Sequence, residues 1–416
     1  MTQLTFLDDV QPSGIAWAGQ RNHALARLKT FVPRAGRAYA STRNYDFGPD
    51  NRDNISCLSP WIKHRLLRED EVLHATLARH SLSGAEKFIQ EVFWRSYFKG
   101  WLEQRTGVWA AYSRDVIAQR EQLDGSTDLR ARYDTAIAGK TGIDCLDAWA
   151  RELIETGYLH NHARMWFASI WIFTLRLPWQ LGADFFYQNL LDGDAAANTL
   201  SWRWVGGLHT KGKNYIARKD NIEKYTDGRF SPIGLVPNAE PLFEAIEHSP
   251  NPLPLVTSLD GLATYGLVIT PEDCHAESLP LPHHPAAILG LTAPNTSTSD
   301  LVKKFADDAL VDALDRAKIH FECTTQNSDK SDIADALVQF AQSNNVTTLV
   351  TAFLPVGPMR DQIDAAMPTL AAAGIRLVQV MRPYDQACWP HATKGFFKLK
   401  AKIPKLIETL TFENPD

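Results

Sequence analysis

The sequence predicts a multidomain α and α/β protein, in which a helical domain comes first and a small parallel-sheet domain comes last. Its length of 416 residues exceeds what one ordinary hydrophobic core organises. Apolar residues recur at helical spacing from residue 66 to about 200, where strand-like alternation is scarce. Beyond residue 285, short apolar runs alternate with helical stretches. We therefore expect domains over 1–232 and 285–416, joined by a segment over 233–284.

Start and stop signals divide the helical part. Ser83–Glu86 has the Ser-x-x-Glu form of a capping box, which predicts a helix that opens there. A second helix is expected from 143 or 144 to 156, because Gly157 is a natural residue to end it. A third helix should run between His160 and Pro178, since proline cannot continue a helix.

The amino-acid composition and pattern of the second half change twice, at about residues 233 and 285. Residues 233–284 are rich in Pro, Asn, Ser and Leu, a composition typical of a connecting segment with few short elements. In 285–416, the runs AAILGL, TLVTAFL and IRLVQVM are short and apolar enough to be buried strands. Between them we expect helices over 300–317, 331–343 and 358–373. This alternation predicts a parallel sheet of four or five strands.

Composition narrows the class of protein. Hydrophobic residues make up 44% and charged residues 22%, as in globular proteins. The most apolar run, 165–175, is too short to cross a membrane, and the start MTQLTFLDDV lacks the pattern of a secretory signal. The five cysteines are scattered and contain no CxxC pair, so we expect a reducing compartment and no metal site. These features together predict a cytoplasmic protein without a membrane or metal partner.

Charge is distributed unevenly along the chain, although the net charge is −5. Residues 1–232 carry 30 Lys and Arg against 26 Asp and Glu, whereas 233–416 carry 13 against 22. Eleven of the twelve tryptophans also lie in the first part. A nucleic-acid face on the first part fits this pattern, and so does an uneven surface charge without functional meaning.

Three segments concentrate Asp, Asn, Arg and Glu residues close to aromatic ones. LLDGDAAANTLSWRW, residues 190–204, places two carboxylates two positions apart, and both can be buried cheaply only if something compensates them. Helical spacing places further polar and aromatic side chains on shared faces. One face carries Asn161, Arg164 and Met165, and another carries Glu91, Trp94, Arg95 and Phe98. Such a set suits a polar aromatic ring that bears phosphate and ribose.

In order and spacing, these segments resemble the FAD-binding domain of DNA photolyases and cryptochromes, from Tyr45 to about Trp204. Tyr45 followed by ISCLS is similar to the family's tyrosine and T-S-x-L-S phosphate-binding turn, with Ile55 in place of the usual Thr. EVFWRSY is similar to its E-x-x-W-R-E-F segment. TGIDCLDAWARELIETGYLHNHARM is similar to its T-G-x-x-x-x-D…G-x-x-H-N-x-x-R-M segment.

The resemblance implies an FAD site. Arg164 would pair with Asp192 beside the flavin, Asp194 would accept hydrogen bonds from the isoalloxazine or ribose side, and Asn198 would face flavin N5. A neutral amide there favours a fully reduced, anionic flavin. The implied FAD-binding residues are Tyr45, Ile55, Ser56, Leu58, Ser59, Glu91, Arg95, Tyr158, Asn161, Arg164, Asp192, Asp194 and Asn198.

The resemblance further implies light-driven repair of cyclobutane pyrimidine dimers in DNA, by electron transfer from excited, reduced FAD and return of the electron after the ring splits. Glu91 would bond the dimer's bases, Trp94 and Trp204 would pack against them, and Met165 would contact the thymine face. The residues given a catalytic role are Glu91, Asn198, Trp202 and Trp179. The last two match the first members of the family's three-tryptophan chain, whose third member has no clear counterpart.

Several alternatives stay open. The chain could be a cryptochrome-like light sensor with a protein partner, or a flavoprotein without light chemistry. His160 is either a catalyst or a satisfied core histidine. The tail RLVQVMRPYDQACWPHATKGFFKLKAKIPKL resembles the end of the family's antenna domain, which normally comes first, and this implies a circular permutation. Taken alone, the tail indicates only a basic amphipathic helix. A second, antenna chromophore is possible but leaves no motif.

Overall fold

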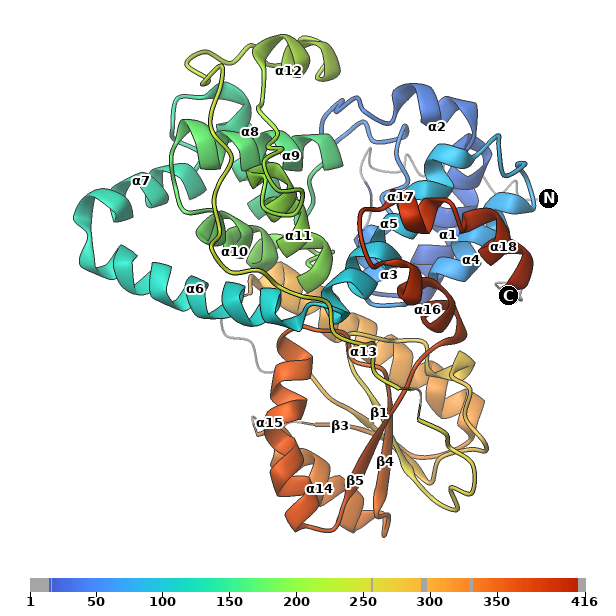
Figure 1. Ribbon diagram of the computed structural model, residues 1–416. Helices are drawn as coiled ribbons and strands as arrows, with labels where there is room; N and C mark the ends of the chain where they lie inside the picture. Colours follow the sequence, from blue (N-terminus) through green and yellow to red (C-terminus); the bar gives the residue numbers. More distant parts are fainter. Residues whose placement is uncertain (1–14, 16, 256, 293–297, 329–331, 411–416) are drawn as a thin grey trace, which may run out of the picture.

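The computed structural model describes residues 15, 17–255, 257–292, 298–328 and 332–410, and it places a parallel-sheet domain beneath two groups of helices (Figure 1). The N-terminal stretch assessed for a secretory signal lies outside the described residues. We call the two groups the first lobe and the second lobe. Among the described helices, none is long and apolar enough to cross a membrane.

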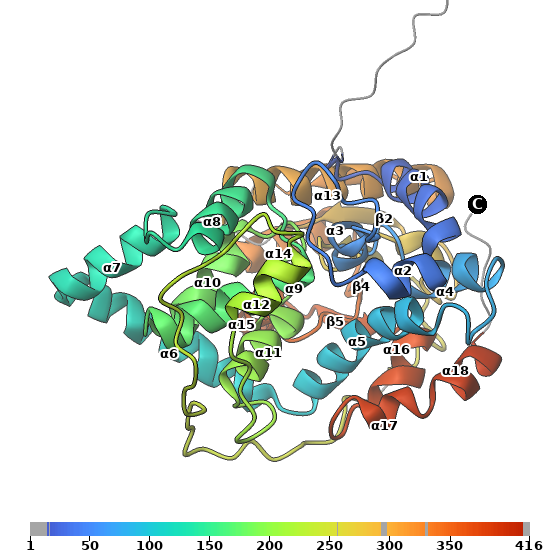
Figure 2. The ribbon, with the colours of Figure 1, turned by 90° about the horizontal axis from the view of Figure 1, so that it is seen from above.

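The first lobe contains five helices from the start of the chain and three from its end. They are α1 (Arg21–Phe31), α2 (Arg37–Thr42), α3 (Ser59–Lys63), α4 (Glu69–Leu77), α5 (Glu86–Glu103), α16 (Pro383–Cys388), α17 (Phe397–Lys400) and α18 (Ile403–Thr409). Seen from above, α16–α18 lie alongside α5 (Figure 2). Segments some 300 positions apart in sequence therefore form one lobe.

The second lobe is continuous in sequence and has its own buried core. It comprises α6 (Thr106–Gly125), α7 (Thr127–Ile137), α8 (Asp144–Thr156), α9 (Asn161–Ser169), α10 (Trp179–Asn189), α11 (Ala195–Gly206) and α12 (Lys219–Tyr225). A π-helical turn over Ile170–Thr174 extends α9. As predicted, α8 ends at Gly157, which takes a left-handed φ of 68°, and the next helix stops before Pro178.

The sheet has five parallel strands in the order β3-β2-β1-β4-β5. Its strands are β1 (Gly266–Ile269), β2 (Ala287–Gly290), β3 (Thr325–Asn327), β4 (Thr348–Ala352) and β5 (Arg376–Val380). The connecting helices are α13 (Asp300–Phe321), α14 (Ile333–Ser343) and α15 (Pro358–Ala372). The predicted alternation of strands and helices after residue 285 is thus confirmed.

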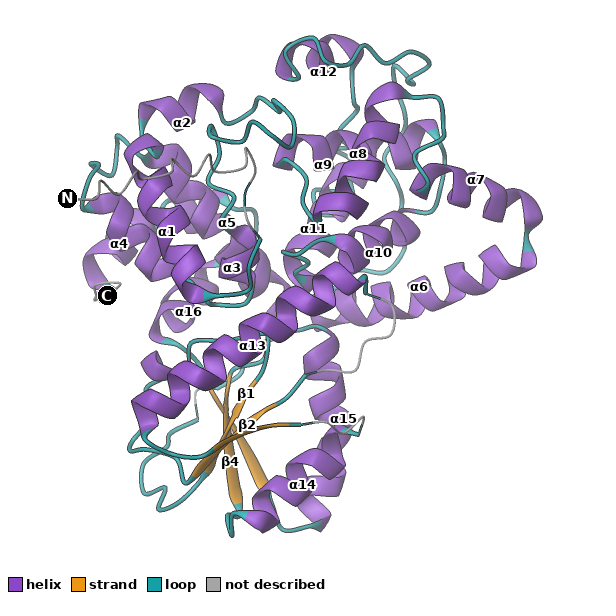
Figure 3. Ribbon diagram, turned by 180° about the vertical axis from the view of Figure 1, so that it is seen from behind, coloured by secondary structure: helices purple, strands orange, loops and turns teal. Residues whose placement is uncertain are grey.

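Side chains of the strands alternate between two cores. Leu267 and Ile269 face the core shared with the first lobe and α13, whereas Val268 faces the core formed with α14 and α15. This alternation follows from the two-residue period of a strand. Figure 3 shows α13 running between the sheet and the helical lobes. Because the first lobe and the sheet share one core, these two parts are packed as one body.

The sheet begins earlier than the sequence predicts. Its central strand, β1, lies inside 233–284, the segment expected to be a connection. The run TYGLVIT contains the apolar residues of a buried strand, but the prolines and polar residues around it mask them. The edge strand β3 is polar and partly exposed, so its sequence carries no comparable signal.

The predicted capping box before α5 is wrong. Ala85 is the residue that precedes the helix, and it makes no side-chain cap. The hydroxyl of Ser81, not Ser83, accepts a hydrogen bond from the Gly84 N–H at 3.1 Å. Glu86 instead forms an ion pair with Lys400 of the tail at 3.2 Å. A tertiary contact from the far end of the chain thus replaces the local one.

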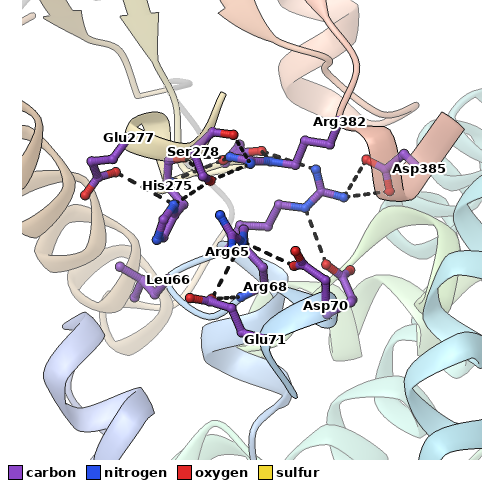
Figure 4. A network of polar contacts seen from close by, with 12 residues as sticks. Arg65, Leu66, Arg68, Asp70, Glu71, His275, Glu277, Ser278, Arg382 and Asp385 are labelled. Atoms are coloured by element: carbon purple, nitrogen blue, oxygen red, sulfur yellow. Dashed lines mark hydrogen bonds and ion pairs between the residues drawn. The ribbon is translucent and has the colours of Figure 1, made fainter. Parts of the chain in front are cut away.

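Four buried charges join the first lobe to the sheet, and we call them the clasp: Arg65, Asp273, Arg382 and Asp385. Arg65 donates to both carboxylate oxygens of Asp385 at 2.8 and 2.7 Å and to Asp273 at 3.2 Å. Arg382 donates to both oxygens of Asp273 at 2.7 Å. Burial alone would raise the pKa of Asp273, but Arg382 and Arg65 hold it far below its usual range. Figure 4 shows Arg65, Arg382 and Asp385 of this group, which come from segments far apart in the chain.

A buried carboxylate on α5 also contacts the sheet domain. Glu103 is 3% exposed and accepts a hydrogen bond from the Val356 N–H, after β4, at 2.5 Å. Burial raises the pKa of Glu103 to about 7, against the opposing effect of that N–H. Above this pH the folded protein must keep a buried negative charge.

We predict that Glu103→Gln changes how stability depends on pH. A raised pKa in the folded state means that ionisation destabilises the fold increasingly as pH rises from about 4 to about 7. The amide cannot ionise, so the variant should gain roughly 2 to 4 kcal/mol relative to wild type between pH 5 and pH 8. Urea unfolding at both pH values measures this gain, and an equal difference at both would contradict it.

Candidate functional site

Two predicted site residues, Asp194 and Arg95, lie where the two lobes meet. Asp194, at the start of α11 in the second lobe, lies 3.5 Å from Lys99 and 3.8 Å from Arg95 on α5 of the first lobe. The Asp194 side chain also caps α11 by accepting a hydrogen bond from the Ala197 N–H at 2.8 Å. Burial would raise the pKa of Asp194, but Lys99, Arg95 and the cap lower it to about 2. This carboxylate is therefore ionised at neutral pH.

The second carboxylate of the motif is paired as expected. Arg164 on α9 donates from Nη2 to Oδ2 of Asp192 at 3.0 Å and from Nε to the Leu159 carbonyl at 3.0 Å. Asp192 is 6% exposed, so each charge offsets the other's desolvation. Asp192 therefore pairs with a cation of the second lobe, whereas Asp194 pairs with cations of the first lobe.

Buried charge and unpaired atoms make this region suitable for an anionic, polar ligand. Three cations, Arg95, Lys99 and Arg164, face two carboxylates, Asp192 and Asp194. In the part of the chain that the structure describes, Nε and Nη2 of Arg95 and Oδ1 of Asp192 are buried without a hydrogen-bond partner. Buried polar groups are normally satisfied, so these atoms fit FAD, which offers phosphates, a ribose and a polar ring.

Tyr158 forms one aromatic wall of this region. Its ring is covered by the guanidinium groups of Arg52 at 4.6 Å and Arg164 at 5.2 Å, and Trp17 stacks on it at 5.0 Å. Arg52 forms a buried ion pair with Glu152 of α8. Sequence analysis missed Arg52 and Glu152, because a pair 100 positions apart leaves no local pattern.

The ISCLS turn is held by hydrogen bonds from the side chain of Arg27 rather than mainly by its own side chains. Arg27 donates to the carbonyls of Ser56 and Ile55, both at 2.8 Å. Cys57 takes a left-handed φ of 54°, and the Ser56 hydroxyl accepts from the Leu58 N–H at 3.4 Å. The side chains of Ile55 and Leu58 are buried, so these two residues can offer a ligand their backbone groups only.

The remaining residues expected to bind FAD differ in exposure. Ser59 begins α3 and is half-buried. Tyr45 is half-buried and stacks on Phe47 at 5.5 Å. Asn161 is exposed at the start of α9. Asn198 is buried, and its Nδ2 donates to the Ala183 carbonyl at 2.7 Å, which fixes the orientation of the amide.

The residues expected to face DNA are only partly available. Glu91 forms an ion pair with Arg43, a partner that sequence analysis missed, and burial raises the pKa of Glu91 despite that pair. Met165 and Trp204 are half-buried. Phe396 of the tail stacks on Trp94 with ring centroids 3.9 Å apart, so this face of Trp94 is not presented to a substrate as predicted.

The aromatic ring that contacts Trp202 is one that the sequence analysis did not single out. Its ring packs edge-on against Trp171 at 6.3 Å, and Trp171 in turn meets Tyr133 at 5.9 Å. Trp179 instead stacks on Tyr112 at 5.4 Å. Gly182 permits the tight packing, because a Cβ there would lie 2.3 Å from the Trp202 ring. Sequence spacing selected Trp179 and missed Trp171, which the π-helical turn carries.

His160 has a structural role. It caps α9 by accepting at Nδ1 from the His162 N–H at 3.1 Å, and its Nε2 lies 3.1 Å from the Arg43 carbonyl. Burial lowers the pKa of His160 to about 4, so the ring is neutral at pH 7 and Nε2 is the donor. Of the two interpretations left open by the sequence, the satisfied core histidine is the one that this geometry matches.

A cavity of about 130 Å³ lies between the lobes and the sheet, and Leu191 and Gly193, beside Asp192, are part of its lining. Lys63, Tyr187, Glu272 and Met359 are among its lining residues. This volume is close to that which holds a benzene-sized ring. The binding of a second, antenna chromophore by this chain stays a prediction.

Comparisons with known proteins agree with this chemistry. Residues 88–230 match the family described as the FAD binding domain of DNA photolyase. The chain is 26% identical to a deoxyribodipyrimidine photo-lyase of Vibrio cholerae, over 58% of this chain and 52% of that protein. It is 31% identical to a cryptochrome DASH of Danio rerio, over 49% of this chain and 38% of that protein.

Among solved structures, a class III photolyase from Agrobacterium tumefaciens matches with a TM-score of 0.40 and 25% identity, over 50% of this chain and 42% of that one. The chain spans about half the length of the curated relatives it matches. The matching family and relatives support a photolyase/cryptochrome FAD-binding domain.

We predict that Arg95→Met lowers FAD affinity at least tenfold. The variant removes the charge and both unpaired donors, and hydrogen bonds to charged groups contribute about 1.5 to 3 kcal/mol. Flavin absorbance per protein after dialysis measures the loss. Lys87→Met, on the exposed side of the same helix, is the matched control. Equal flavin content in both variants would contradict this assignment.

Proposed function

We propose that this chain, whose FAD-binding domain places it in the photolyase/cryptochrome family, uses light to split cyclobutane pyrimidine dimers in DNA. The observation that carries the proposal is the excess of positive charge, buried at Lys99 and half-buried at Arg95 and Arg164, on the helices that meet at Asp194 and Asp192. Arg95, Lys99 and Arg164 outnumber the carboxylates of Asp192 and Asp194, which favours a negatively charged, reduced flavin there. The substrate would place the protein with the chromosome in the cytoplasm.

The residues of the chain have distinct roles in this proposal. The chemistry that bound, reduced FAD supplies is light-driven donation of an electron to the dimer. Asn198 would offer its amide oxygen, because its nitrogen donates to the Ala183 carbonyl, and a neutral amide does not readily release a proton. Glu91, oriented by Arg43, would accept hydrogen bonds from the bases. The dimer would leave the DNA stack to reach them, and a damaged step costs less to open.

One observation favours a light sensor instead. Phe396 occupies the stacking face of Trp94, which in the repair proposal would pack on the bases. A sensor needs no such face, and its acidic second half would contact a protein partner. The two proposals differ in whether light changes the DNA.

The arrangement of the tail supports a circular permutation as a further proposal. Residues 383–409 follow β5 and return to pack on α5, so the end of the sheet domain adjoins the helices that begin the chain (Figure 2). A chain rejoined in the other order would need little rearrangement of these elements.

We predict light-dependent recovery of intact thymines from an oligonucleotide that carries one thymine dimer. Glu91→Ala and Asn198→Ala should each reduce the rate at least tenfold, the loss expected for one hydrogen bond to a charged group. Glu155→Ala, at an exposed position, should not. Chromatography of the bases in light and darkness provides the measurement. A photoreducible flavoprotein that repairs neither single- nor double-stranded DNA would favour the sensor.

We also predict that electrons reach the flavin through Trp202, Trp171 and Tyr133. Their rings are in successive contact, and Tyr133 is only half-buried. With an external thiol present, Trp171→Phe should slow the light-driven loss of visible flavin absorbance at least tenfold, whereas Trp179→Phe should slow it much less. The reverse order of effects would restore the path expected from the sequence.

A further inference from the structure

The C-terminal tail carries a concentrated positive charge in an acidic half of the chain. Residues 394–405 contain five of the 13 basic residues found in 233–416, and no acidic residue. Lys400 pairs with Glu86 at 3.2 Å. The other four, Lys394, Lys398, Lys402 and Lys405, are exposed, and no ion pair joins them to another described residue. We call these four lysines and Phe397 the tail surface.

The tail surface is rigidly mounted on α5. Phe396, Leu399, Ile403 and Leu406 recur at helical spacing, are buried, and pack into the core of the first lobe. Phe396 stacks on Trp94, and the Tyr97 hydroxyl donates to the Lys394 carbonyl at 2.8 Å. The lysines thus point outward from a fixed base, and burial together with the charges of Lys402 and Lys405 lowers the pKa of His391.

An aromatic ring lies within this positive field. Phe397 is 80% exposed, although its neighbour Phe396 is only 4% exposed. Folding therefore leaves a large apolar ring in water between Lys394 and Lys398. Proteins that bind single-stranded nucleic acid combine these two features: cations that follow the phosphates and exposed rings on which bases stack.

We propose that the tail surface binds a single strand of nucleic acid, with phosphates on its four lysines and one base stacked on Phe397. A membrane surface fits less well, because a membrane-bound helix inserts an apolar face, and here that face is buried in the core. The inference shares with the proposed repair function only the choice of nucleic acid as partner. It assigns a binding surface on α17 and α18, outside the flavin site.

The test measures binding of the full chain to undamaged fluorescent oligo-dT in darkness, over a range of salt concentrations. Lys398→Gln with Lys402→Gln should lower the slope of log affinity against log salt by about 1.4, since each contact with a single strand contributes about 0.7. The matched control removes two exposed lysines elsewhere, Lys140 and Lys318, and should leave the slope unchanged. Equal slopes for both pairs would overturn the proposal.

Substitution of Phe397 provides a second test of the proposal. Phe397→Ala should weaken oligo-dT binding at least about fivefold, and Phe397→Trp should restore it, because stacking needs a ring face. Binding that is unaffected by Phe397→Ala, or tail-dependent binding to phosphatidylserine vesicles instead of oligo-dT, would overturn the proposal. Because no dimer and no light are used, failure here is distinguishable from failure of repair.

Discussion

The clasp between Arg65, Asp273, Arg382 and Asp385 is the interaction on which the arrangement of the chain depends. It ties the turn after α3 to the residues that follow β1 and β5, at 5% exposure or less for every member. Arg65 itself takes a left-handed φ of 50°, a strained conformation for a residue with a side chain, and its ion pairs offset that strain. Isolated buried charges would oppose folding, so the two segments are stable only together.

This constraint extends to the site between the lobes. The turn that carries Arg65 directly follows the ISCLS segment and α3, and the core of the first lobe includes α5. Arg95 and Lys99 on α5 are thereby held against Asp194 of the second lobe. A rigid first lobe can keep unpaired donors and an excess of positive charge buried, where a loose one would let water in. The fixed electrostatics that suit a reduced flavin therefore originate in packing against the sheet.

Local patterns predicted most of the fold and the family resemblance implied the Arg164–Asp192 pair, whereas partners distant in sequence were out of reach. Apolar periodicity located the helices and three strands, and the Arg164–Asp192 pair was expected and found. The central strand β1 was missed because four apolar residues among prolines resemble a connection. The stacking of Phe396 on Trp94 joins positions some 300 apart, and no pattern in either segment encodes it. Trp171, whose ring contacts Trp202, was missed because linear spacing does not specify which side chains face each other.

The most direct test of the account is a double-mutant cycle across the clasp, with the free energy of unfolding measured for Arg65→Met, Asp385→Leu and the combination. Each single change leaves a buried charge without its partner and should cost about 3 to 5 kcal/mol. The combined variant should lose at least about 2 kcal/mol less than the sum, because both members of the pair are then absent. Losses that add to within about 0.5 kcal/mol would show that Arg65 and Asp385 do not couple the start of the chain to its C-terminal tail.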